Sequence, residues 1–339
     1  MLDLTGRCRL VLEAGTCQHD VGWALRAAAA AAQTGAWGFK VQLLTADTIT
    51  SRAARPYSHG LKEPASQHEA FSGALPYTAW RIVKDLCDDL GIEWFASCWD
   101  EAAVDACMDL GVRWFKVGSG DLTHETLLRH VGSTGVPVIL SMGAAEPWEI
   151  ERAFGWIGHD LVLPMVCTLA YPCPPDQAHL ARVDEWVRHG HQAGYSDHTV
   201  GLEAPLIASM IGAVMVEKHF TITPGAGGDH DFGIRPDQAE WLVDRLDSLW
   251  GTGPPESVFM GDSVQRRLLV ERRAAEGARR SWHTVNAQEA GRAFGDLVAL
   301  RPGGGLEPTV ENREALRYTS ALRGYEAGEM IDQTELVFD

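Results

Sequence analysis

The sequence has few cysteines, no long apolar run and no excess of positive charge, and each absence excludes a class of protein. The seven cysteines are irregularly spaced and form no Cys-x-x-Cys motif, which favours reduced thiols in a cytoplasmic protein. The longest apolar run, around residues 208–216, is far shorter than the ~20 residues of a membrane span. Residues 1–7 lack an apolar signal core. The net charge of −17 opposes binding to nucleic acid or an anionic membrane.

Short apolar runs alternate with helical stretches over the first 250 residues. We expect strands at residues 9–14, 38–43, 94–97, 114–117, 136–141, 161–166, 193–196 and 213–218. We expect helices at residues 23–34, 77–90, 101–110, 147–154, 180–189 and 237–250. Eight strand–helix units over about 250 residues predict an α/β fold of the (β/α)8 TIM-barrel type. A doubly wound sheet is the alternative, but no glycine fingerprint follows the first strand.

The Gly- and Pro-rich stretches of the chain indicate three regions. A catalytic barrel is expected at residues 1–250, because a Gly- and Pro-rich stretch follows at residues 251–255. A linker is expected at residues 251–278, with a charged helix at 264–278 whose arginines face solvent. Residues 279–339 would form a small C-terminal domain, which is short enough that we expect it to pack on something.

Polar residues gather at the C-terminal ends of all eight expected strands, where barrel enzymes build active sites. Ordinary strand ends would favour Gly, Asn and Asp, rather than two lysines, two histidines and a glutamate. The residues concerned are Glu13, Lys40, Gln42, Ser97, Lys116, Ser119, Asp121, Ser141, Thr168, Tyr171, Ser196, His198 and His219.

Lys40 and Lys116 lie within apolar strands, and a lysine is rarely buried there without an anion. Together with nearby serine hydroxyls they could hold a small phosphorylated carboxylate. The alternative is a Lys–Glu pair inside the barrel, for example Glu13 with Lys40.

His198 and His219 end neighbouring strands, so their imidazoles would converge on a catalytic metal such as Mn, Zn or Fe. Asp197 and Glu217 are candidates to orient them. The alternative is that His198 only caps a turn. The Gly-rich loop at residues 225–231 could move as a lid, in which Asp229 binds substrate hydroxyls and His230 is a third ligand or an ordinary turn residue.

In order and spacing, these motifs resemble the N-acetylneuraminate (sialic acid) synthase family over nearly the whole chain. The tail resembles the family's antifreeze-like domain. The matching segments are residues 13–15, 39–42, 115–121, 138–143, 167–168, 171–172, 194–199, 217–221 and 229–230, with 279–281 and 301–306 in the tail.

The resemblance implies that phosphoenolpyruvate condenses with the open-chain aldehyde of an aminosugar such as N-acetylmannosamine. Phosphate leaves by C–O cleavage, and a 3-deoxy-2-ulosonic acid of the sialic or nonulosonic type forms. By position, Lys40 and Ser97 would contact the phosphoenolpyruvate carboxylate. The phosphate would be held by Lys116, Ser119, Ser141 and Ser196.

The resemblance also implies a metal and a partner. His198 and His219 would bind Mn²⁺, with Mg²⁺ or Co²⁺ as alternatives, to polarise the aldehyde oxygen. Glu13 and Asp121 would complete the catalytic set. The acceptor would be bound by Gln42, Tyr171, Asp229 and Arg301. Arg301 would come from a partner subunit, which implies a domain-swapped homodimer.

Four departures from the family pattern bear on the acceptor. Cys17-Gln18 stands where the family has Asn-His, with His19 one place late; Asp121 replaces Glu; Leu169 replaces a polar residue; and Ser97 replaces Thr. The lysines and histidines are retained, so we expect the phosphoenolpyruvate and metal chemistry to be intact on an acceptor unlike N-acetylmannosamine. The alternatives are an unusual sugar or nucleoside-derived aldehyde, or a catalytically silent sugar-binding homologue.

Overall fold

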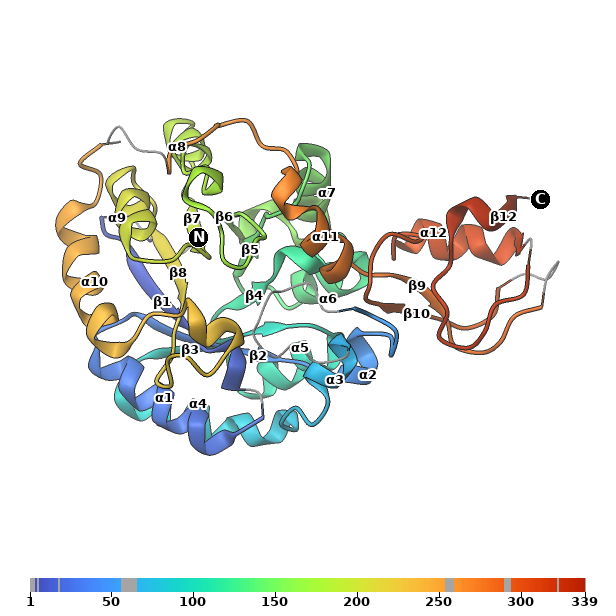
Figure 1. Cartoon of the computed structure of the whole chain (residues 1–339), viewed down its shortest axis with the longest axis horizontal. Helices are drawn as coiled ribbons and strands as arrows, with labels where there is room; N and C mark the ends of the chain where they lie inside the picture. Colours follow the sequence, from blue (N-terminus) through green and yellow to red (C-terminus); the bar gives the residue numbers. More distant parts are fainter. Residues whose placement is uncertain are drawn as a thin grey trace.

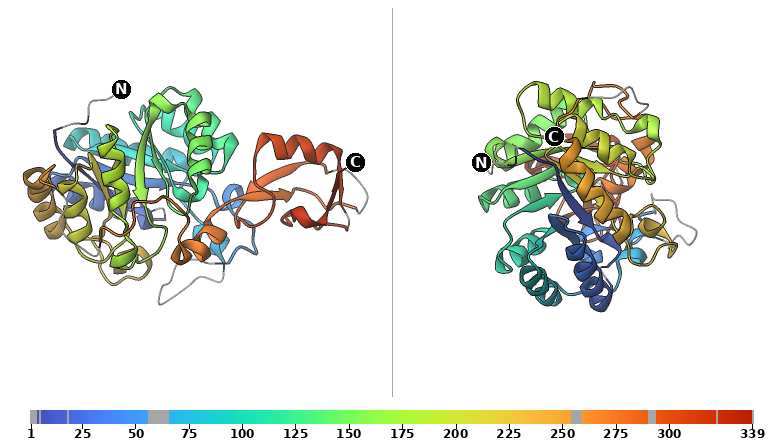
Figure 2. Two further views of the ribbon diagram at one scale, coloured as in Figure 1. Left: turned by 90° about the horizontal axis from the view of Figure 1, so that it is seen from above. Right: turned by 90° about the vertical axis from the view of Figure 1, so that its left-hand side faces the viewer.

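The computed structural model describes residue 4 and residues 6–17, 19–55, 66–253, 259–289, 294–321 and 323–338. It contains a closed barrel of eight parallel strands in sequential order, with the tail projecting from one side (Figures 1 and 2). The strands are β1 Arg9–Glu13, β2 Gly38–Leu43, β3 Glu93–Cys98, β4 Phe115–Val117, β5 Val138–Ser141, β6 Val162–Cys167, β7 Gly194–Asp197 and β8 Met215–His219. Pairing of β1 with β8 closes the barrel and sets Glu13 opposite His219. The predicted TIM barrel is confirmed.

Helices surround the barrel and follow most of the predicted segments. They are α1 Val21–Gln33, α4 Trp80–Leu90, α5 Glu101–Asp109, α6 Glu125–Ser133, α7 Pro147–Ile157, α8 Ala181–Arg188, α9 Glu203–Met210 and α10 Pro236–Leu249, with the short α2 Ala46–Ile49 and α3 Gln67–Phe71 after β2. The sequence did not predict α6 and α9. Both are short, and α9 carries Pro205 in its first turn and is largely buried, so it lacks the one-sided apolar pattern of a surface helix.

The alternation of side chains between the two faces of each strand places polar residues at one end of the barrel interior. One end of the interior is filled by apolar side chains that include Val11, Phe95, Ile139, Met165 and Met215. Because side chains alternate between the two faces of a strand, the residue two places further on also points inward. Those next residues are Glu13, Ser97, Ser141, Cys167 and Glu217. The strand pattern therefore produces a plugged barrel with polar groups at its C-terminal end.

The linker lies against the barrel. The backbone N–H groups of Leu180 and Ala181 donate to Phe259 O and Met260 O at 2.9 and 2.8 Å. The chain then forms a 3₁₀ turn, Leu269–Glu271, and helix α11, Arg272–Ala278. The helix predicted at residues 264–278 is therefore shorter than expected. A side chain at Gly120 would lie 2.7 Å from Ala278 O, so α11 packs closely on the loop after β4.

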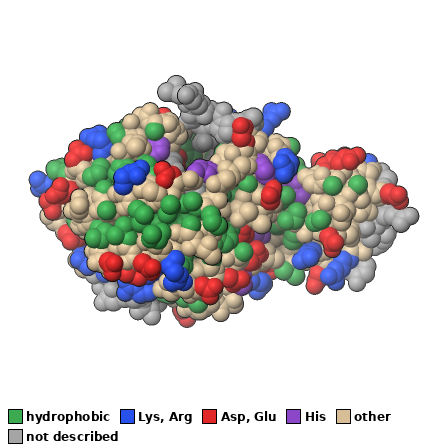
Figure 3. All heavy atoms as spheres, turned by 90° about the horizontal axis from the view of Figure 1, so that it is seen from below, with side chains coloured by type: hydrophobic (Ala, Val, Ile, Leu, Met, Phe, Trp, Pro, Cys, Tyr) green, Lys and Arg blue, Asp and Glu red, His purple; other side chains and the backbone are tan. Residues whose placement is uncertain are grey.

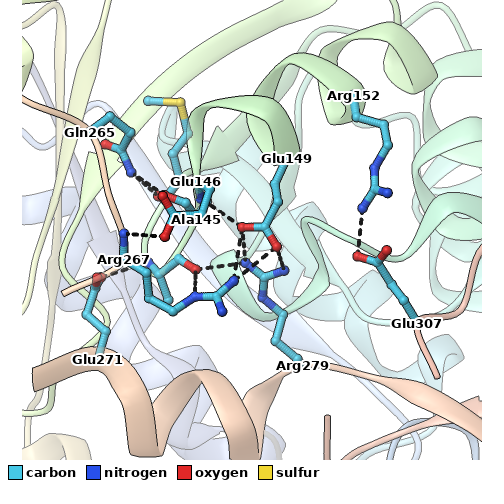
Figure 4. A network of polar contacts seen from close by, with 11 residues as sticks. Ala145, Glu146, Glu149, Arg152, Gln265, Arg267, Glu271, Arg279 and Glu307 are labelled. Atoms are coloured by element: carbon cyan, nitrogen blue, oxygen red, sulfur yellow. Dashed lines mark hydrogen bonds and ion pairs between the residues drawn. The ribbon is translucent and has the colours of Figure 1, made fainter. Parts of the chain in front are cut away.

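The arginines of residues 264–278 were expected to face solvent, and the side chains of Arg266 and Arg267 are 54% and 39% exposed. Arg267 and Arg279 pair with Glu149 of α7 at 3.0 and 3.1 Å (Figure 4). Arg279 is nearly buried, and the Glu149 carboxylate supplies the charge that makes this tolerable. Arg266 pairs with Asp262.

The tail forms two small antiparallel sheets: β9 Ser281–Thr284 with β10 Leu297–Leu300, and β11 Thr319–Ala321 with β12 Leu336–Phe338. With the short helix α12, Val310–Ala315, they surround a core that includes Trp282, Leu316 and Ile331. The tail contacts its own barrel, where Arg152 of α7 pairs with Glu307 at 2.7 Å (Figure 4).

The surface of the described residues carries charges of both signs. On the face that Figure 3 shows, Lys and Arg side chains lie among Asp and Glu side chains rather than in one broad basic patch. Within the same described residues, no helix combines the length and the apolar character that crossing a membrane would require.

Candidate active site

Two lysines converge on one buried carboxylate at the mouth of the barrel. Lys40 Nζ and Lys116 Nζ lie 3.5 and 3.8 Å from Glu217 Oε1. Ser196 Oγ donates to the same oxygen at 3.1 Å. Lys40 also lies 3.4 Å from Glu13 Oε1, so the Lys–Glu pair considered from the sequence is present together with the lysine cluster. Glu217 was expected only to orient a histidine, and its bridging position was missed.

The charges around the lysines nearly balance. Burial alone would lower the pKa of Lys40, but the charges of Glu13 and Glu217 outweigh it and raise that pKa above its usual value. Burial lowers the pKa of Lys116, against the opposing charge of Glu217. Burial favours the neutral form of Glu217, yet Lys116 and Lys40 hold its pKa below the usual range. The site is thus a set of paired charges that an anionic substrate would rearrange.

The serines predicted to bind phosphoenolpyruvate lie beside these lysines or on the adjoining loops. Lys40 Nζ donates to Ser97 Oγ at 3.2 Å, and Lys116 Nζ donates to Ser141 Oγ at 2.7 Å. Ser119 lies just beyond β4, where its Oγ accepts from Gly143 N at 2.9 Å. The loop after β5 therefore fixes the Ser119 hydroxyl.

His198 is held in one tautomer beside Tyr171. Its Nδ1 lies 2.9 Å from Thr168 O, a carbonyl that can only accept, so Nδ1 carries the proton and Nε2 keeps its lone pair. Burial, together with the charge of His219, lowers the pKa of His198 to about 4. The Tyr171 ring lies 4.2 Å from the His198 ring. A neutral imidazole with a fixed tautomer is a suitable metal ligand.

His219 lies between two carboxylates. Its Nδ1 is 2.7 Å from Glu13 Oε2 and 3.4 Å from Asp229 Oδ2. Burial would lower the pKa of His219, but the charges of Glu13 and Asp229 raise it to about 10. The imidazole is thus a cation at neutral pH when no metal ion is bound.

The same three residues have the chemistry of a divalent-cation site. One donor atom from each of Glu13, His219 and Asp229 lies within 4.8 Å of the others. Glu13 Oε2 and His219 Nδ1 are buried, yet despite their short separation neither has a partner in hydrogen-bonding geometry. Mixed nitrogen and carboxylate donors suit Mn²⁺ and similar ions. The sequence predicted His198 and His219 as the ligand pair; their ring centres lie 5.3 Å apart, and the carboxylate donors were not assigned to a metal.

Asp197 does not orient either histidine, and that expectation is wrong. Its carboxylate accepts from Lys218 Nζ at 2.5 Å, and both side chains are fully buried. The reason is strand alternation, since Ser196 and Glu217 face the barrel interior while Asp197 and Lys218 face away from it.

Asp121 and Arg301 meet within one chain. Asp121 Oδ1 accepts from Arg280 Nε at 2.8 Å, and Oδ2 accepts from Arg301 Nη2 at 3.3 Å. Arg301 also lies over the Trp99 ring at 4.1 Å. The sequence placed Arg301 at a partner's barrel, whereas here it contacts its own. Burial would raise the pKa of Asp121, but Arg280 and Arg301 hold it below its usual value.

Among the departures at the barrel mouth, packing explains Leu169. The Leu169 side chain is buried in an apolar cluster with Ala274, Ala275 and Ala278 of α11, so its apolar character serves packing against the linker. His19 does not replace the missing histidine, because its Nε2 contacts Ala70 O at 3.0 Å. Cys17 is buried, and Gln18 lies outside the described residues.

Two of the predicted acceptor residues, Gln42 on β2 and Asp229 in the loop after β8, each contact a member of the Glu13–His219 pair. Gln42 Nε2 donates to Glu13 Oε1 at 2.9 Å, and Asp229 lies beside His219. His230 is turned elsewhere, with Nδ1 2.7 Å from Thr221 Oγ1.

The closed (β/α)8 barrel gathers two lysines, several serines and a histidine–carboxylate cluster at the C-terminal ends of its strands. This is the architecture of a barrel enzyme for an anionic substrate. The chain belongs to the NeuB family, whose model matches residues 27–252. The sequence-based resemblance is thereby confirmed, and the protein is a carbon–carbon bond-forming synthase of the phosphoenolpyruvate-dependent kind.

Individual relatives agree with this assignment. The chain is 28% identical to the N,N'-diacetyllegionaminic acid synthase of Legionella pneumophila over 323 residues, 89% of this chain and 87% of that protein. It is 28% identical to the spore coat polysaccharide biosynthesis protein SpsE of Bacillus subtilis over 312 residues, 87% of this chain and 83% of that protein. The crystal structure of SpsE gives a TM-score of 0.80 over 98% of this chain and 96% of that one, at 26% identity. The N-acetylneuraminic acid synthetase of Leptospira borgpetersenii shares the fold, with a TM-score of 0.64 over 80% of this chain and 90% of that one, at 24% identity.

Proposed function

We propose that the protein condenses phosphoenolpyruvate with the open-chain aldehyde of an N-acetylated aminosugar, giving a nonulosonic-type acid and phosphate. The observation that carries this proposal is the convergence of Lys40 and Lys116 on Glu217, next to the histidine–carboxylate cluster. In the reaction, C3 of phosphoenolpyruvate bonds to the aldehyde carbon. Water adds to C2, and the C2–O bond to phosphate breaks.

The lysines and serines would hold the enolpyruvate. Lys40 with Ser97 suits the carboxylate, and Lys116 with Ser141 suits the phosphate, because each ammonium group already shares a hydrogen bond with its serine. Each charge-assisted contact contributes about 1.5–3 kcal/mol. Binding the anion draws the ammonium groups away from Glu217, which stabilises them while the site is empty.

The histidine–carboxylate cluster would hold the aldehyde end. A divalent cation on His198 and His219, with Glu13 and Asp229 as further donors, supplies Lewis-acid polarisation of the aldehyde oxygen when bound, and Mn²⁺ is our first choice. Gln42 holds Glu13 in place, and Tyr171 packs on His198. Without the cation, the proton on His219 offsets part of the negative charge of Glu13 and Asp229.

Two residues at the barrel mouth bear on the identity of the acceptor. An acceptor different from N-acetylmannosamine was expected partly from Leu169 and Asp121. Leu169 packs on α11, and Asp121 pairs with Arg280 and Arg301, so neither residue by itself argues for a different sugar. An N-acetylmannosamine-like aldehyde is therefore the leading candidate, and other aldehydes are alternatives.

A direct assay tests the function. The purified protein is stripped with chelator, supplied with Mn²⁺ and phosphoenolpyruvate, and tested on N-acetylmannosamine, other N-acetylated aldoses and nucleoside-derived aldehydes. Phosphate release and the mass of the product are recorded. We expect release only in the presence of an acceptor, with a product heavier by the enolpyruvate unit. Aldose binding without release of phosphate from phosphoenolpyruvate, whichever acceptor is supplied, would instead indicate a silent sugar-binding homologue.

A further inference from the structure

Glu271, in the linker just before α11, reaches back into the barrel. Its side chain is completely buried. Oε1 accepts two backbone hydrogen bonds, from Ala144 N at 2.7 Å and from Leu169 N at 3.0 Å. Oε2 accepts from Leu268 N at 2.7 Å. Ala144 lies in the loop after β5 and Leu169 in the loop after β6, so one carboxylate oxygen joins the two loops.

Each loop carries a different half of the candidate active site. Gly143, next to Ala144, donates its N–H to the hydroxyl of Ser119 at 2.9 Å. Thr168, next to Leu169, accepts the Nδ1 hydrogen bond that fixes the tautomer of His198 at 2.9 Å. Displacement of the Glu271 carboxylate would therefore disturb a predicted phosphate contact and a predicted metal ligand together.

The surroundings of Glu271 favour this fixed geometry. The Leu169 side chain packs with the alanines of α11, which excludes water from the carboxylate. Arg182 is the nearby positive charge: burial lowers the pKa of its guanidinium, and the Glu271 charge opposes that fall. A buried carboxylate that accepts several N–H groups is costly to replace, because each released N–H would lose its partner out of reach of water.

Other linker side chains contact the loop after β5, while the linker backbone at residues 259–262 contacts the distant end of the loop after β6. Gln265 Nε2 donates to Ala145 O at 2.8 Å, and Arg267 Nε and Arg279 Nη2 donate to Ala144 O at 2.8 and 2.9 Å (Figure 4). Within the contacts of the described residues, Glu271 is the linker side chain that hydrogen-bonds both loops.

We propose that Glu271 is a positioning residue of the synthase: it sets the loops after β5 and β6 relative to each other, and so aligns the anion-binding and histidine halves of the site. The role of these halves in phosphoenolpyruvate binding rests on the proposed function. Glu271 itself touches no reacting atom.

The test compares Glu271→Gln with Glu276→Gln, a control in the following helix α11 whose side chain is 67% exposed. Glutamine keeps the volume but directs an NH₂ group at one of the backbone N–H donors. We expect the Kd for phosphoenolpyruvate, measured by calorimetry, to rise at least tenfold in Glu271→Gln and less than twofold in the control. The KM of the acceptor should rise as well, because the loop after β6 also carries Tyr171 and the Thr168 carbonyl that fixes His198.

Hydrogen exchange separates positioning from a general loss of stability. The amides of Ala144 and Leu169 should exchange faster in Glu271→Gln, while amides of β1 and β2 keep their protection. Wild-type affinity for phosphoenolpyruvate in Glu271→Gln, with both amides still protected, would overturn the inference. If that variant does not fold, Leu169→Ala removes the packing over the carboxylate, and the same two amides should again exchange faster.

The outcomes also distinguish this inference from the proposed function. Wild-type protein that binds no phosphoenolpyruvate would refute the proposed function alone. The positioning role would then be decided by the exchange of Ala144 and Leu169, with unchanged exchange counting against it.

Discussion

The Glu217 carboxylate should stabilise the empty site and at the same time weaken its affinity for anions. It lies 3.5 Å from Lys40 and 3.8 Å from Lys116, and all three side chains are buried. Breaking a buried ion pair costs about 3–5 kcal/mol, because a charge is left without a partner. Lys40 keeps Glu13 as a partner at 3.4 Å. The loss of unfolding free energy in Glu217→Gln should therefore lie at the lower end of this range, about 3 kcal/mol.

This cost should be visible in thermal unfolding of the ligand-free protein. For a domain of this size each kcal/mol shifts the melting temperature by about 2–4 °C, so Glu217→Gln should melt roughly 6–12 °C lower. Phosphoenolpyruvate or inorganic phosphate should then raise the melting temperature of the variant more than that of the wild type, because the added anion becomes the counter-charge of Lys116. Glu151→Gln, at a carboxylate that is 75% exposed, is the matched control.

The pH dependence gives a second readout with a defined sign. Burial lowers the pKa of Lys116 in the folded protein, so the unfolded chain binds more protons between that pKa and the usual value of 10.5. The contribution of Lys116 to the free energy of unfolding therefore rises with pH between its folded-state pKa and 10.5. Removing the Glu217 charge lowers the folded pKa further and widens the window, so the deficit of Glu217→Gln should shrink as the pH rises toward 10.5. A variant as stable as wild type, with no larger response to anions, would refute the reasoning.

Three further changes test other parts of the site. Lys116→Met should weaken phosphoenolpyruvate binding at least tenfold by calorimetry, from the loss of about 1.5–3 kcal/mol, and an unchanged Kd would rule out the anion pocket. Chelation should abolish turnover and Mn²⁺ restore it, whereas His219→Ala should stay inactive after Mn²⁺ is added; full activity of that variant would exclude the metal assignment. Asp121→Asn removes the charge shared by Arg280 and Arg301, and should cost about 3 kcal/mol or more in the free energy of unfolding. Light scattering on the same variant would show whether the expected homodimer depends on this contact, and a monomeric wild-type protein with full activity would contradict the dimer.

The barrel could be predicted because its strands are buried on both faces and therefore appear as apolar runs. Helix α9 was missed because burial on most sides removed its one-sided pattern. The polar strand ends could be predicted because each polar residue interrupts or directly follows one of these apolar runs. Asp197 was placed wrongly although strand alternation alone puts it on the opposite face from Ser196.

The remaining contacts could not be predicted from local patterns. The pairing of Asp121 with Arg301 joins residues 180 positions apart and depends on how the tail docks. The hydrogen bonds of Glu271 depend on the course of the linker, and the sequence gives no period or motif for such a path. The sharing of Glu217 by Lys40 and Lys116 requires knowing how far each side chain reaches across the barrel.

Among the described residues, the apolar plug of the barrel, with Val11, Phe95 and Met215 among its members, fills the end of the barrel opposite the site. On β8, Glu217 precedes His219 by two residues, so the lysine cluster lies about 6–7 Å deeper than the histidine. Under the proposed function, the enolpyruvate must then arrive before the aldehyde, since a sugar bound first would block its path. Phosphate, released at the deeper position, would leave only after the new acid has moved out. The apolar plug would thus determine the order in which substrates bind and products leave.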